Sequence, residues 1–543
     1  MQYTLDNISD KQRERRHPLS FCYRWAICLV GALIFGYALF RILFPDVTLR
    51  QWWDRNMLYG FSAIAAMIAV GAVLWSMFYL IDRLAPRHLN QAVLVLMLLA
   101  CALCILCIAL FSIAPAWDYG VLLRSALELS RDGVLTDPIY FSRYPFQIYP
   151  LLYMTLFMKL VHVRTIAAAC GVSYVLNTVH ILLALYGAFF CGKLFRGRRF
   201  GLKILLLCLC SVPLFLYAPI CYTDTLALPF PVWTLALWLY ARRAAFITRR
   251  QRIKKIALYI GSGMMAGFGL RIKSIAAIGL IAMILFLLFD RTEPEERDDH
   301  SSVRWQHPAV KKCMTILLLL AGFLIVVAGS SLIAGAAGYG DLHDDRYTYP
   351  MTHWFMMGAN RETVGGYNAD DDLFTRSIPS YAQRQQQTAA RFEERLRMDG
   401  ASGYLNFLFD KLEVMLCTGD YQSVGKLAQH PLRSYPALES KDSPLLQWYL
   451  ACQQAFQAVI LFSLFAGICL LAWRPDGWLF RFSAMMLIGV VLFLLVWEGK
   501  ARYLLFLVPV INIASVSGFC SIQRCFMRLP GLKRGRRHGA ETA

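Results

Sequence analysis

One carboxylate follows a long apolar segment almost at once, in the motif Trp117-Asp118-Tyr119-Gly120. Residues 92–113 carry no charged side chain, so Asp118 is expected at the end of a membrane helix, near the membrane surface. Three more groups of polar residues fall on the same side of the membrane in the predicted topology. Asp118 is therefore a candidate active-site residue, although a charge at such a boundary is ordinary on its own.

Two further motifs carry cations that suit phosphate. Arg271 and Lys273 interrupt the apolar stretch 256–289, and Arg502 lies in Glu498-Gly499-Lys500-Ala501-Arg502-Tyr503 at the start of the last apolar stretch. Cations near a membrane surface attract phosphate, and the planar fork of Arg matches its oxygens. The alternatives are snorkelling of Arg271 and Lys273 to lipid headgroups, and an interfacial anchor in which Glu498 pairs with Arg502.

Other polar groups have competing interpretations. Asp224, in Cys221-Tyr222-Thr223-Asp224-Thr225, is a candidate site residue or a helix cap. His353 and Trp354 are candidate site residues or members of an aromatic belt. We interpret the run Asp370-Asp371-Asp372 as a solvated turn rather than a metal site. No metal site is predicted at the Cys101, Cys104 and Cys107 triplet, because its apolar span holds no His or acidic residue.

The elements that must position these residues are membrane helices. The chain has 543 residues, of which 58% are hydrophobic and 17% charged, and its mean hydropathy of +0.48 excludes a soluble protein with one ordinary core. We predict an all-α polytopic membrane protein with about twelve spans. They are residues 21–43, 57–81, 92–113, 168–195, 203–218, 226–241, 256–270, 274–289, 313–335, 453–473, 478–497 and 503–522.

The net charge of +20 is interpreted as a topology signal rather than as a nucleic-acid surface. Basic runs near both ends of the chain and at 193–203 and 242–255 fall on one side if both termini are cytoplasmic. Binding of anionic lipid by the same runs is a compatible alternative. Residues 148–161 are too short for a span and are predicted as an interfacial or re-entrant helix within the outer loop 114–165.

This predicted membrane topology divides the chain into six parts. They are a cytoplasmic basic arm (1–20), a two-helix extension (21–91), a membrane core (92–335), a small soluble outer segment (336–448) with helices near 381–397 and 403–416, C-terminal membrane helices (449–522) and a cytoplasmic basic tail (523–543).

Over residues 92–522 the chain resembles the GT-C membrane glycosyltransferases, especially the protein O-mannosyltransferases, the aminoarabinose transferases and their bacterial relatives. The motifs that carry the resemblance, in order, are Asp118, Tyr140-Phe141-Ser142-Arg143-Tyr144-Pro145, Tyr222-Thr223-Asp224, Arg271-Ile272-Lys273, the patch from Thr352 to Gly358, and the motif from Glu498 to Tyr503. Many protein mannosyltransferases have an acidic residue after the first-loop Asp, whereas this chain has Tyr119, which leaves a protein acceptor open.

The resemblance implies transfer of a sugar from a polyprenyl-phosphate donor to an acceptor hydroxyl on the outer face of a bacterial plasma membrane, with inversion at the anomeric carbon. It makes Asp118 the base and Arg271, Lys273 and Arg502 donor-phosphate ligands. The substrate is expected to contact Tyr119, Tyr144, Asp224, His353, Trp354, Glu498 and Tyr503.

The partners expected are therefore the lipid-linked sugar, an unidentified hydroxyl acceptor and the lipid bilayer, without nucleic acid. No cofactor is assigned, and a divalent cation stays open as an additional component. A secondary transporter or lipid flippase is the alternative function, but its charged groups are expected near mid-membrane and often within inverted repeats. A non-catalytic scaffold is a third interpretation, which predicts that Asp118→Asn retains function.

Overall fold

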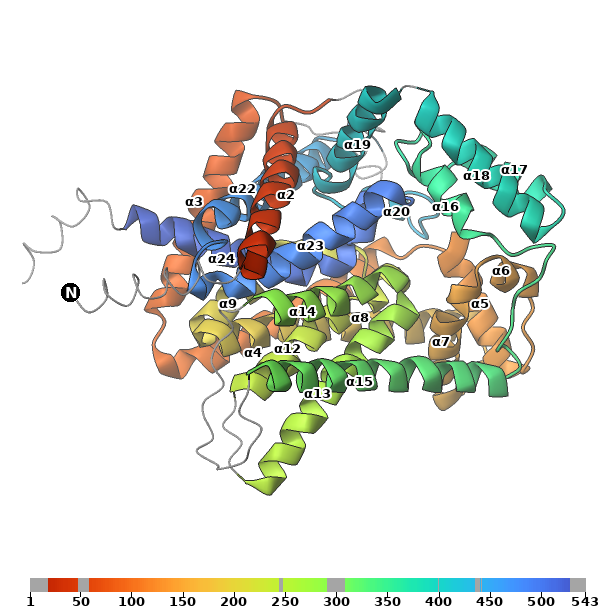
Figure 1. Cartoon of the computed structure of the whole chain (residues 1–543), viewed down its shortest axis with the longest axis horizontal. Helices are drawn as coiled ribbons and strands as arrows, with labels where there is room; N and C mark the ends of the chain where they lie inside the picture. The colour runs from red at the N-terminus through yellow and green to blue at the C-terminus, as the bar shows by residue number, and fades with distance from the viewer. Residues whose placement is uncertain are drawn as a thin grey trace, which may run out of the picture.

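The computed structural model describes residues 18–46, 58–243, 248–290, 308–398, 400–434, 440 and 442–527, and across these residues the backbone is helical without a strand (Figure 1). One isolated antiparallel bridge joins Ile113 to Pro431. The all-α prediction is therefore confirmed. Most of the basic arm 1–20 and of the basic tail 523–543 lies outside the described residues.

Eight described helical segments are long and apolar enough to cross a bilayer, which needs about 20 apolar residues per helix. They coincide with eight of the twelve predicted spans. They are α2 (Pro18–Leu43), α3 (Phe61–Arg83), η3 with α4 (Pro86–Phe111), α8 (Ile166–Arg196), α15 (Pro308–Ala336), α22 (Pro444–Leu471), η6 with α23 (Pro475–Val496), and η7 with α24 (Ala501–Phe526).

The other four predicted spans fall on shorter or more polar helices. These are α9 (Arg198–Cys210) with α10 (Pro213–Leu216), α12 (Pro229–Arg243), α13 (Arg249–Ile272), and η5 (Ser274–Ala277) with α14 (Ile278–Phe289). α9, α12 and α14 have 13, 15 and 12 residues. Each rises only about 18–23 Å, less than a bilayer core of about 30 Å. A count of twelve spans therefore stays a prediction.

The predicted outer loop (114–165) and the predicted outer segment (336–448) form short helices. The loop holds α5 (Trp117–Arg131), α6 (Pro138–Arg143), η4 (Pro145–Gln147) and α7 (Ile148–Leu160), and α7 has only 13 residues, as predicted for a helix too short to span. The segment holds α16 (Met351–Gly358), α17 (Ala369–Ser377), α18 (Tyr381–Arg397), α19 (Gly400–Leu416) and α20 (Ser423–Leu427). α18 and α19 confirm the two helices predicted there.

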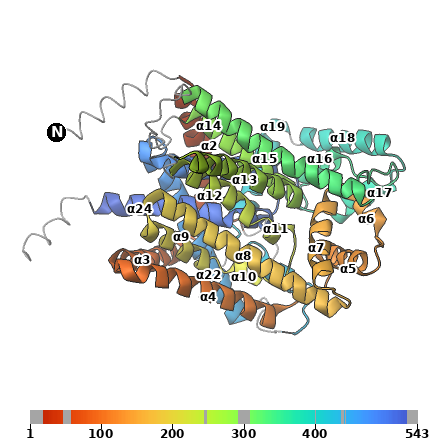
Figure 2. The same cartoon turned by 90° about the horizontal axis from the view of Figure 1, so that it is seen from below.

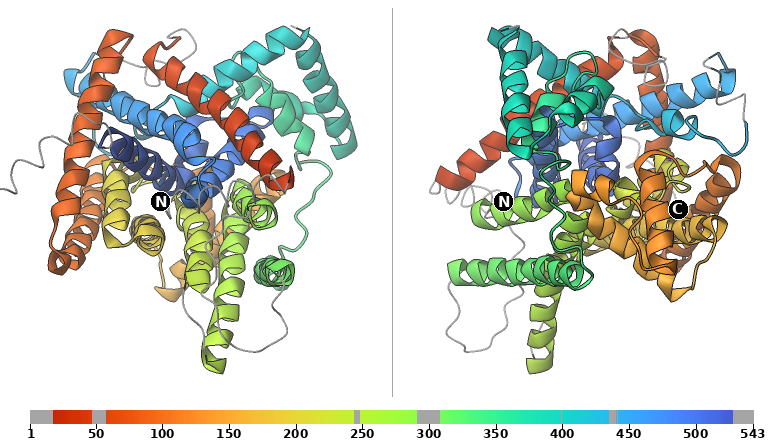
Figure 3. Two further views of the ribbon diagram at one scale, coloured as in Figure 1. Left: turned by 60° about the vertical axis from the view of Figure 1, so that its left-hand side comes forward. Right: turned by 90° about the vertical axis from the view of Figure 1, so that its right-hand side faces the viewer.

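The short helices gather at one end of the molecule. In Figures 1 and 2, α5 to α7 and α16 to α18 lie at the end opposite the C-terminal end of α24. The right-hand view of Figure 3 looks at this end, where the orange helices of the loop lie near the teal helices of the segment. The arrangement brings together motifs that are far apart in the sequence.

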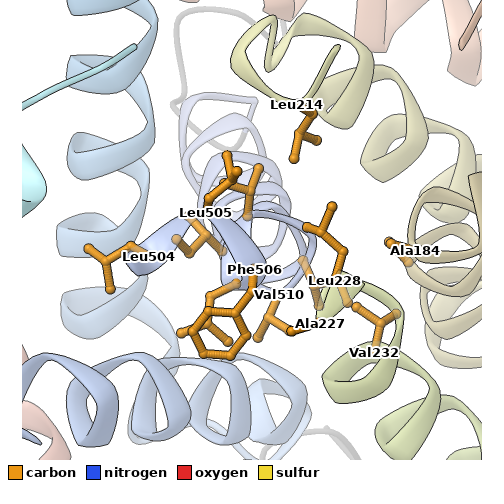
Figure 4. Close-up of a cluster of buried hydrophobic side chains, with 14 of the residues drawn as sticks. Ala184, Leu214, Ala227, Leu228, Val232, Leu504, Leu505, Phe506 and Val510 are labelled. Carbon is orange, nitrogen blue, oxygen red and sulfur yellow. The ribbon is translucent and has the colours of Figure 1, made fainter. Parts of the chain in front are cut away.

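The interior is formed by the C-terminal helices. α22, α23 and α24 are mostly buried, whereas α3, α4 and α15 expose most of their apolar side chains. Figure 4 shows Leu504, Leu505 and Phe506 of η7 (Ala501–Leu507) in a buried cluster with Leu214 and Val232. Close packing of these apolar side chains holds η7 firmly, and η7 carries Arg502.

The first helix is packed into this interior. A Cβ at Gly31 of α2 would lie 2.6 Å from Cδ1 of Ile468 on α22, so the two helices approach closely there. Arg41 near the end of α2 forms an ion pair with the buried Glu413 of α19. The predicted two-helix extension therefore contacts both the buried helix α22 and the predicted outer segment, and it does so through α2.

Candidate functional site

Two tyrosine hydroxyls hold the Asp118 carboxylate. Asp118 lies in the first turn of α5, where the positive end of the helix dipole favours a negative side chain. Its Oδ1 accepts a hydrogen bond of 3.1 Å from Tyr140, and its Oδ2 accepts one of 3.3 Å from Tyr222. Gln147 donates from Nε2 to the Tyr222 hydroxyl at 2.7 Å. Asp118 is half-buried, so its carboxylate is oriented while part of the residue stays accessible.

The start of α5 is tightly constrained. Trp117 has a φ of 43°, in the left-handed region that is strained for a residue with a Cβ. A Cβ at Gly120 would lie 2.6 Å from the carbonyl oxygen of Pro115, so this position requires glycine. Lys426 Nζ lies 4.4 Å, and the Arg502 guanidinium carbon 5.7 Å, from the centre of a Trp117 ring. These cation–π contacts help to hold Trp117, and with it the neighbouring Asp118.

A second carboxylate organises two of the predicted phosphate ligands. Asp224 lies on α11 (Thr223–Leu226), whose N-cap residue is Tyr222, so the cap interpretation of Asp224 is wrong. Lys273 Nζ donates to Asp224 Oδ1 at 2.6 Å, and Arg502 Nε lies 3.3 Å from Asp224 Oδ2. Burial acts to raise the pKa of Asp224, but the charges of Lys273 and Arg502 outweigh it and hold this pKa below its usual value.

Arg502 retains unused hydrogen-bonding capacity. The residue is 6% exposed, and no acceptor within the described part of the chain bonds its terminal guanidinium nitrogens. Glu498 accepts a hydrogen bond of 2.8 Å from the Tyr503 hydroxyl, and Lys500 Nζ lies 3.4 Å from the same Glu498 oxygen. The predicted alternative, a pair of Glu498 with Arg502, is therefore not formed. Two donor nitrogens of Arg502 are left for an anion.

Sequence analysis missed Lys426, on α20. The segment after α19 is fixed by its main chain, because Ala114 N donates to the His430 carbonyl at 2.8 Å and Tyr217 donates its hydroxyl to the Tyr421 carbonyl at 2.9 Å. Burial, followed by the charges of Arg502 and Lys500, lowers the pKa of Lys426 to about 7. No sequence motif marks this residue, which reaches the site only through the folding of its segment.

Two of the predicted site residues, Arg271 and Tyr119, do not point toward the side chains of Asp118 and Asp224. Arg271, the penultimate residue of α13, donates to Ser330, Ser331 and the Val327 carbonyl on α15 at 2.6–2.8 Å. It therefore lies apart from the Asp224 group. Tyr119 is fully buried in the apolar interior, because a side chain one position along a helix points about 100° away from its neighbour. Its predicted contact with substrate is not supported by this placement.

Tyr144, His353 and Trp354 belong to an aromatic group beside Asp118. The Tyr144 ring lies 5.0 Å from that of Tyr140 and 6.0 Å from that of Trp354. His353 is buried, and its Nδ1 lies 2.7 Å from the Thr375 hydroxyl. Burial lowers the pKa of His353 to about 4, so its ring is neutral at neutral pH. Tyr144 and Trp354 are half-buried, which leaves them better placed than His353 to contact a ligand.

The three-aspartate run was predicted to be a solvated turn, and this prediction is wrong. The run forms the first turn of α17. Asp371 and Asp372 are buried and form ion pairs with Arg395 and Arg376. Arginine partners and the helix N-terminus together stabilise these carboxylates. Across the described residues, no group of three or more His, Cys, Asp or Glu side chains is arranged to hold a metal ion.

These features define an integral membrane protein whose polar groups converge at one end of a helical bundle. Residues 24–519 match the family described as conserved hypothetical integral membrane proteins, and the chain belongs to that family. The match reaches from α2 to α24 and confirms the prediction of a membrane protein. No curated protein and no solved structure matches the chain.

Proposed function

We propose that this protein is an integral-membrane glycosyltransferase of the GT-C type. It transfers a sugar from a polyprenyl-phosphate donor to an acceptor hydroxyl on the extracytoplasmic face, with inversion. The observation that carries the proposal is the position of Asp118, held by Tyr140 and Tyr222 beside the cations that surround Asp224. The order of these motifs along the chain, which resembles that of GT-C enzymes, supports it.

Asp118 is the proposed general base. Its carboxylate takes the proton of the acceptor hydroxyl while the acceptor oxygen bonds to the anomeric carbon. The bond between that carbon and the phosphate oxygen breaks, and its electron pair leaves with the lipid phosphate. The hydrogen bonds from Tyr140 and Tyr222 orient the carboxylate, which reduces the entropy lost when the reacting groups meet.

The proposed role of the cations is to stabilise charge on the departing phosphate. The group contains four cations, Lys273, Lys426, Lys500 and Arg502, and three carboxylates, Asp118, Asp224 and Glu498. Four positive and three negative charges leave an excess of one positive charge when all are ionised. A phosphate diester donor carries one negative charge, and phosphate departure adds a second, which such cations stabilise.

The test is sugar transfer by the full chain in proteoliposomes that contain a panel of radiolabelled polyprenyl-phosphate sugars. We expect transfer, or slow donor hydrolysis, with at least one donor, and about a ten-fold or larger loss in Lys273→Ala. Donor binding should weaken in the same variant, because a ligand of the phosphate is removed. If no donor is turned over and the lipid moves between leaflets, the proposal of sugar transfer is wrong and lipid transport is the function.

A further inference from the structure

The predicted outer segment contains a cavity. This cavity of about 730 Å³ opens between the loop 360–368, α17 and α18. This volume falls in the range of about 300–1,000 Å³ that is typical of small-ligand sites. The lining combines polar side chains from all three elements with one aromatic ring. It includes the polar residues Glu362, Asp370, Gln387, Arg391 and Glu394 and the aromatic residue Phe374.

The base of this cavity is fixed by a buried ion pair. Asp371 is fully buried, and its two oxygens accept hydrogen bonds of 2.7 and 2.8 Å from Arg395. Asn360 adds a hydrogen bond of 2.8 Å from its Nδ2. Arg395 and the side-chain hydrogen bonds hold the pKa of Asp371 below its usual value although burial acts to raise it. The cavity therefore has a preformed polar base rather than one that a ligand must organise.

Charges of both signs surround the cavity. Its lining holds three guanidinium groups, of Arg361, Arg391 and Arg395, and three carboxylates, of Glu362, Asp370 and Glu394, while the buried Asp371 at its base pairs with Arg395. Three positive and four negative charges leave no excess of positive charge for an anion. Such a lining offers many donors and many acceptors, which is what hydroxyl groups require, because each hydroxyl both donates and accepts.

Two further features suit a sugar ring. Phe374 supplies an apolar surface, with the Arg391 guanidinium 4.6 Å from its ring centre. In addition, the side chains of Asp370 and Gln387 have no hydrogen-bond partner among the described residues. Their donors and acceptors are therefore available to a ligand.

The loop 360–368 connects this cavity to the Asp118 site. On one side it contributes Asn360 and Glu362 to the cavity. On the other side Gly499 N donates to the Gly365 carbonyl at 2.9 Å, and Lys500 Nζ lies 5.4 Å from the centre of the Tyr367 ring. A ligand in the cavity is thus separated from the cations of the site by a single loop.

We propose that this cavity binds the acceptor as a neutral carbohydrate, through Asp370, Gln387 and the Phe374 ring. The designation of this carbohydrate as the acceptor rests on the proposed function. The cavity holds part of the acceptor away from the reacting hydroxyl, so that remote binding contributes to orientation at the anomeric carbon.

The experiment measures binding without transfer. Saturation-transfer NMR is recorded on the full chain in nanodiscs with maltotriose, mannotriose and triacetylchitotriose as probes. We expect a signal from at least one trisaccharide, reduced about five-fold or more in the double variant Asp370→Ala/Gln387→Ala. The matched control is Gln386→Ala, an exposed position of α18 outside the cavity lining, which should keep the signal.

Absence of signal from all three probes, or an equal signal from the double variant, would overturn the proposal. Asp118→Asn should bind the trisaccharide as wild type does, because Asp118 lies outside the cavity lining. Failure of the binding measurement would therefore count against the cavity alone. Full transfer activity in Asp118→Asn would count against the proposed function and leave the binding result intact.

Discussion

The hydroxyl of Tyr222 lies 3.3 Å from Oδ2 of Asp118, although the two residues are 104 positions apart in the chain. Tyr222 is the N-cap residue of α11 and precedes Asp224 by two positions. One four-residue helix thus connects the proposed base to the carboxylate that binds Lys273 and Arg502. The two halves of the site are built as one unit.

Replacing Tyr222 by Phe removes a hydrogen bond to a charged group and keeps the ring. Such a bond contributes roughly 1.5–3 kcal/mol, so we expect kcat for sugar transfer to fall about ten-fold or more while KM for the donor changes little. Steady-state transfer assays measure both constants. Tyr153→Phe is the control, because its hydroxyl bonds His180 and not Asp118. Equal kcat values for Tyr222→Phe and wild type would contradict the orienting role.

Asp224→Ala leaves Lys273 and Arg502 in a buried place without their counter-charge. Breaking a buried ion pair in this way costs about 3–5 kcal/mol, so we expect a clearly lower free energy of unfolding. Asp224→Ala/Lys273→Met removes one of the two stranded charges and should recover part of the loss. Thermal unfolding of the purified variants measures this. The coupling would be disproved if the effects of the two substitutions simply added.

Donor binding should depend on pH through Lys426. The pKa of Lys426 is lowered to about 7, so its ammonium is charged below pH 7 and loses its charge as the pH rises through that value. A phosphate diester keeps its charge over this range. We therefore expect donor affinity to fall about five-fold between pH 6 and pH 8, for an interaction of ~1 kcal/mol. Equilibrium binding in nanodiscs measures it, and Lys426→Arg should give a flatter profile. A steep profile in Lys426→Arg would assign the titration to another group.

The polar motifs at the ends of apolar stretches predicted several residues that lie together in the structure. Asp118, Asp224, Lys273 and Arg502 converge because each lies where a helix begins or ends at the same end of the molecule. Such positions are visible in hydropathy alone. The direction of a side chain is not visible, and Tyr119, which follows Asp118 and is implied by the resemblance to contact substrate, is fully buried in the structure.

Other residues depended on tertiary contacts that periodicity does not encode. Arg271 and Lys273 are two positions apart, but Arg271 is still helical and faces α15, whereas Lys273 is extended and faces Asp224. Lys426 lies in a polar segment without a motif, and its segment is placed by main-chain bonds to 112–114. The three-aspartate run was misjudged because its arginine partners, Arg376 and Arg395, become neighbours through α17 and α18.

The number of spans was less predictable than the class of fold. Apolar stretches such as 203–218 and 274–289 predict membrane helices, yet the first is divided into two helices at Pro213 and the second is one helical run that is shorter than a membrane-spanning helix. α9 ends before Pro213, and η5 precedes α14. Proline lacks a backbone N–H and favours the start of a new helix, so the apolar run continues while the helix does not.

The central claim, that Asp118 is the base of a sugar transfer, is tested most directly by transfer from a radiolabelled polyprenyl-phosphate sugar in proteoliposomes. Asp118→Asn is compared with wild type and with Asp132→Asn, which changes an exposed carboxylate just beyond the end of the same helix, α5. We predict that transfer falls about a hundred-fold or more in Asp118→Asn at unchanged insertion and donor binding, and is retained in Asp132→Asn. Equal transfer by Asp118→Asn and wild type would contradict the claim.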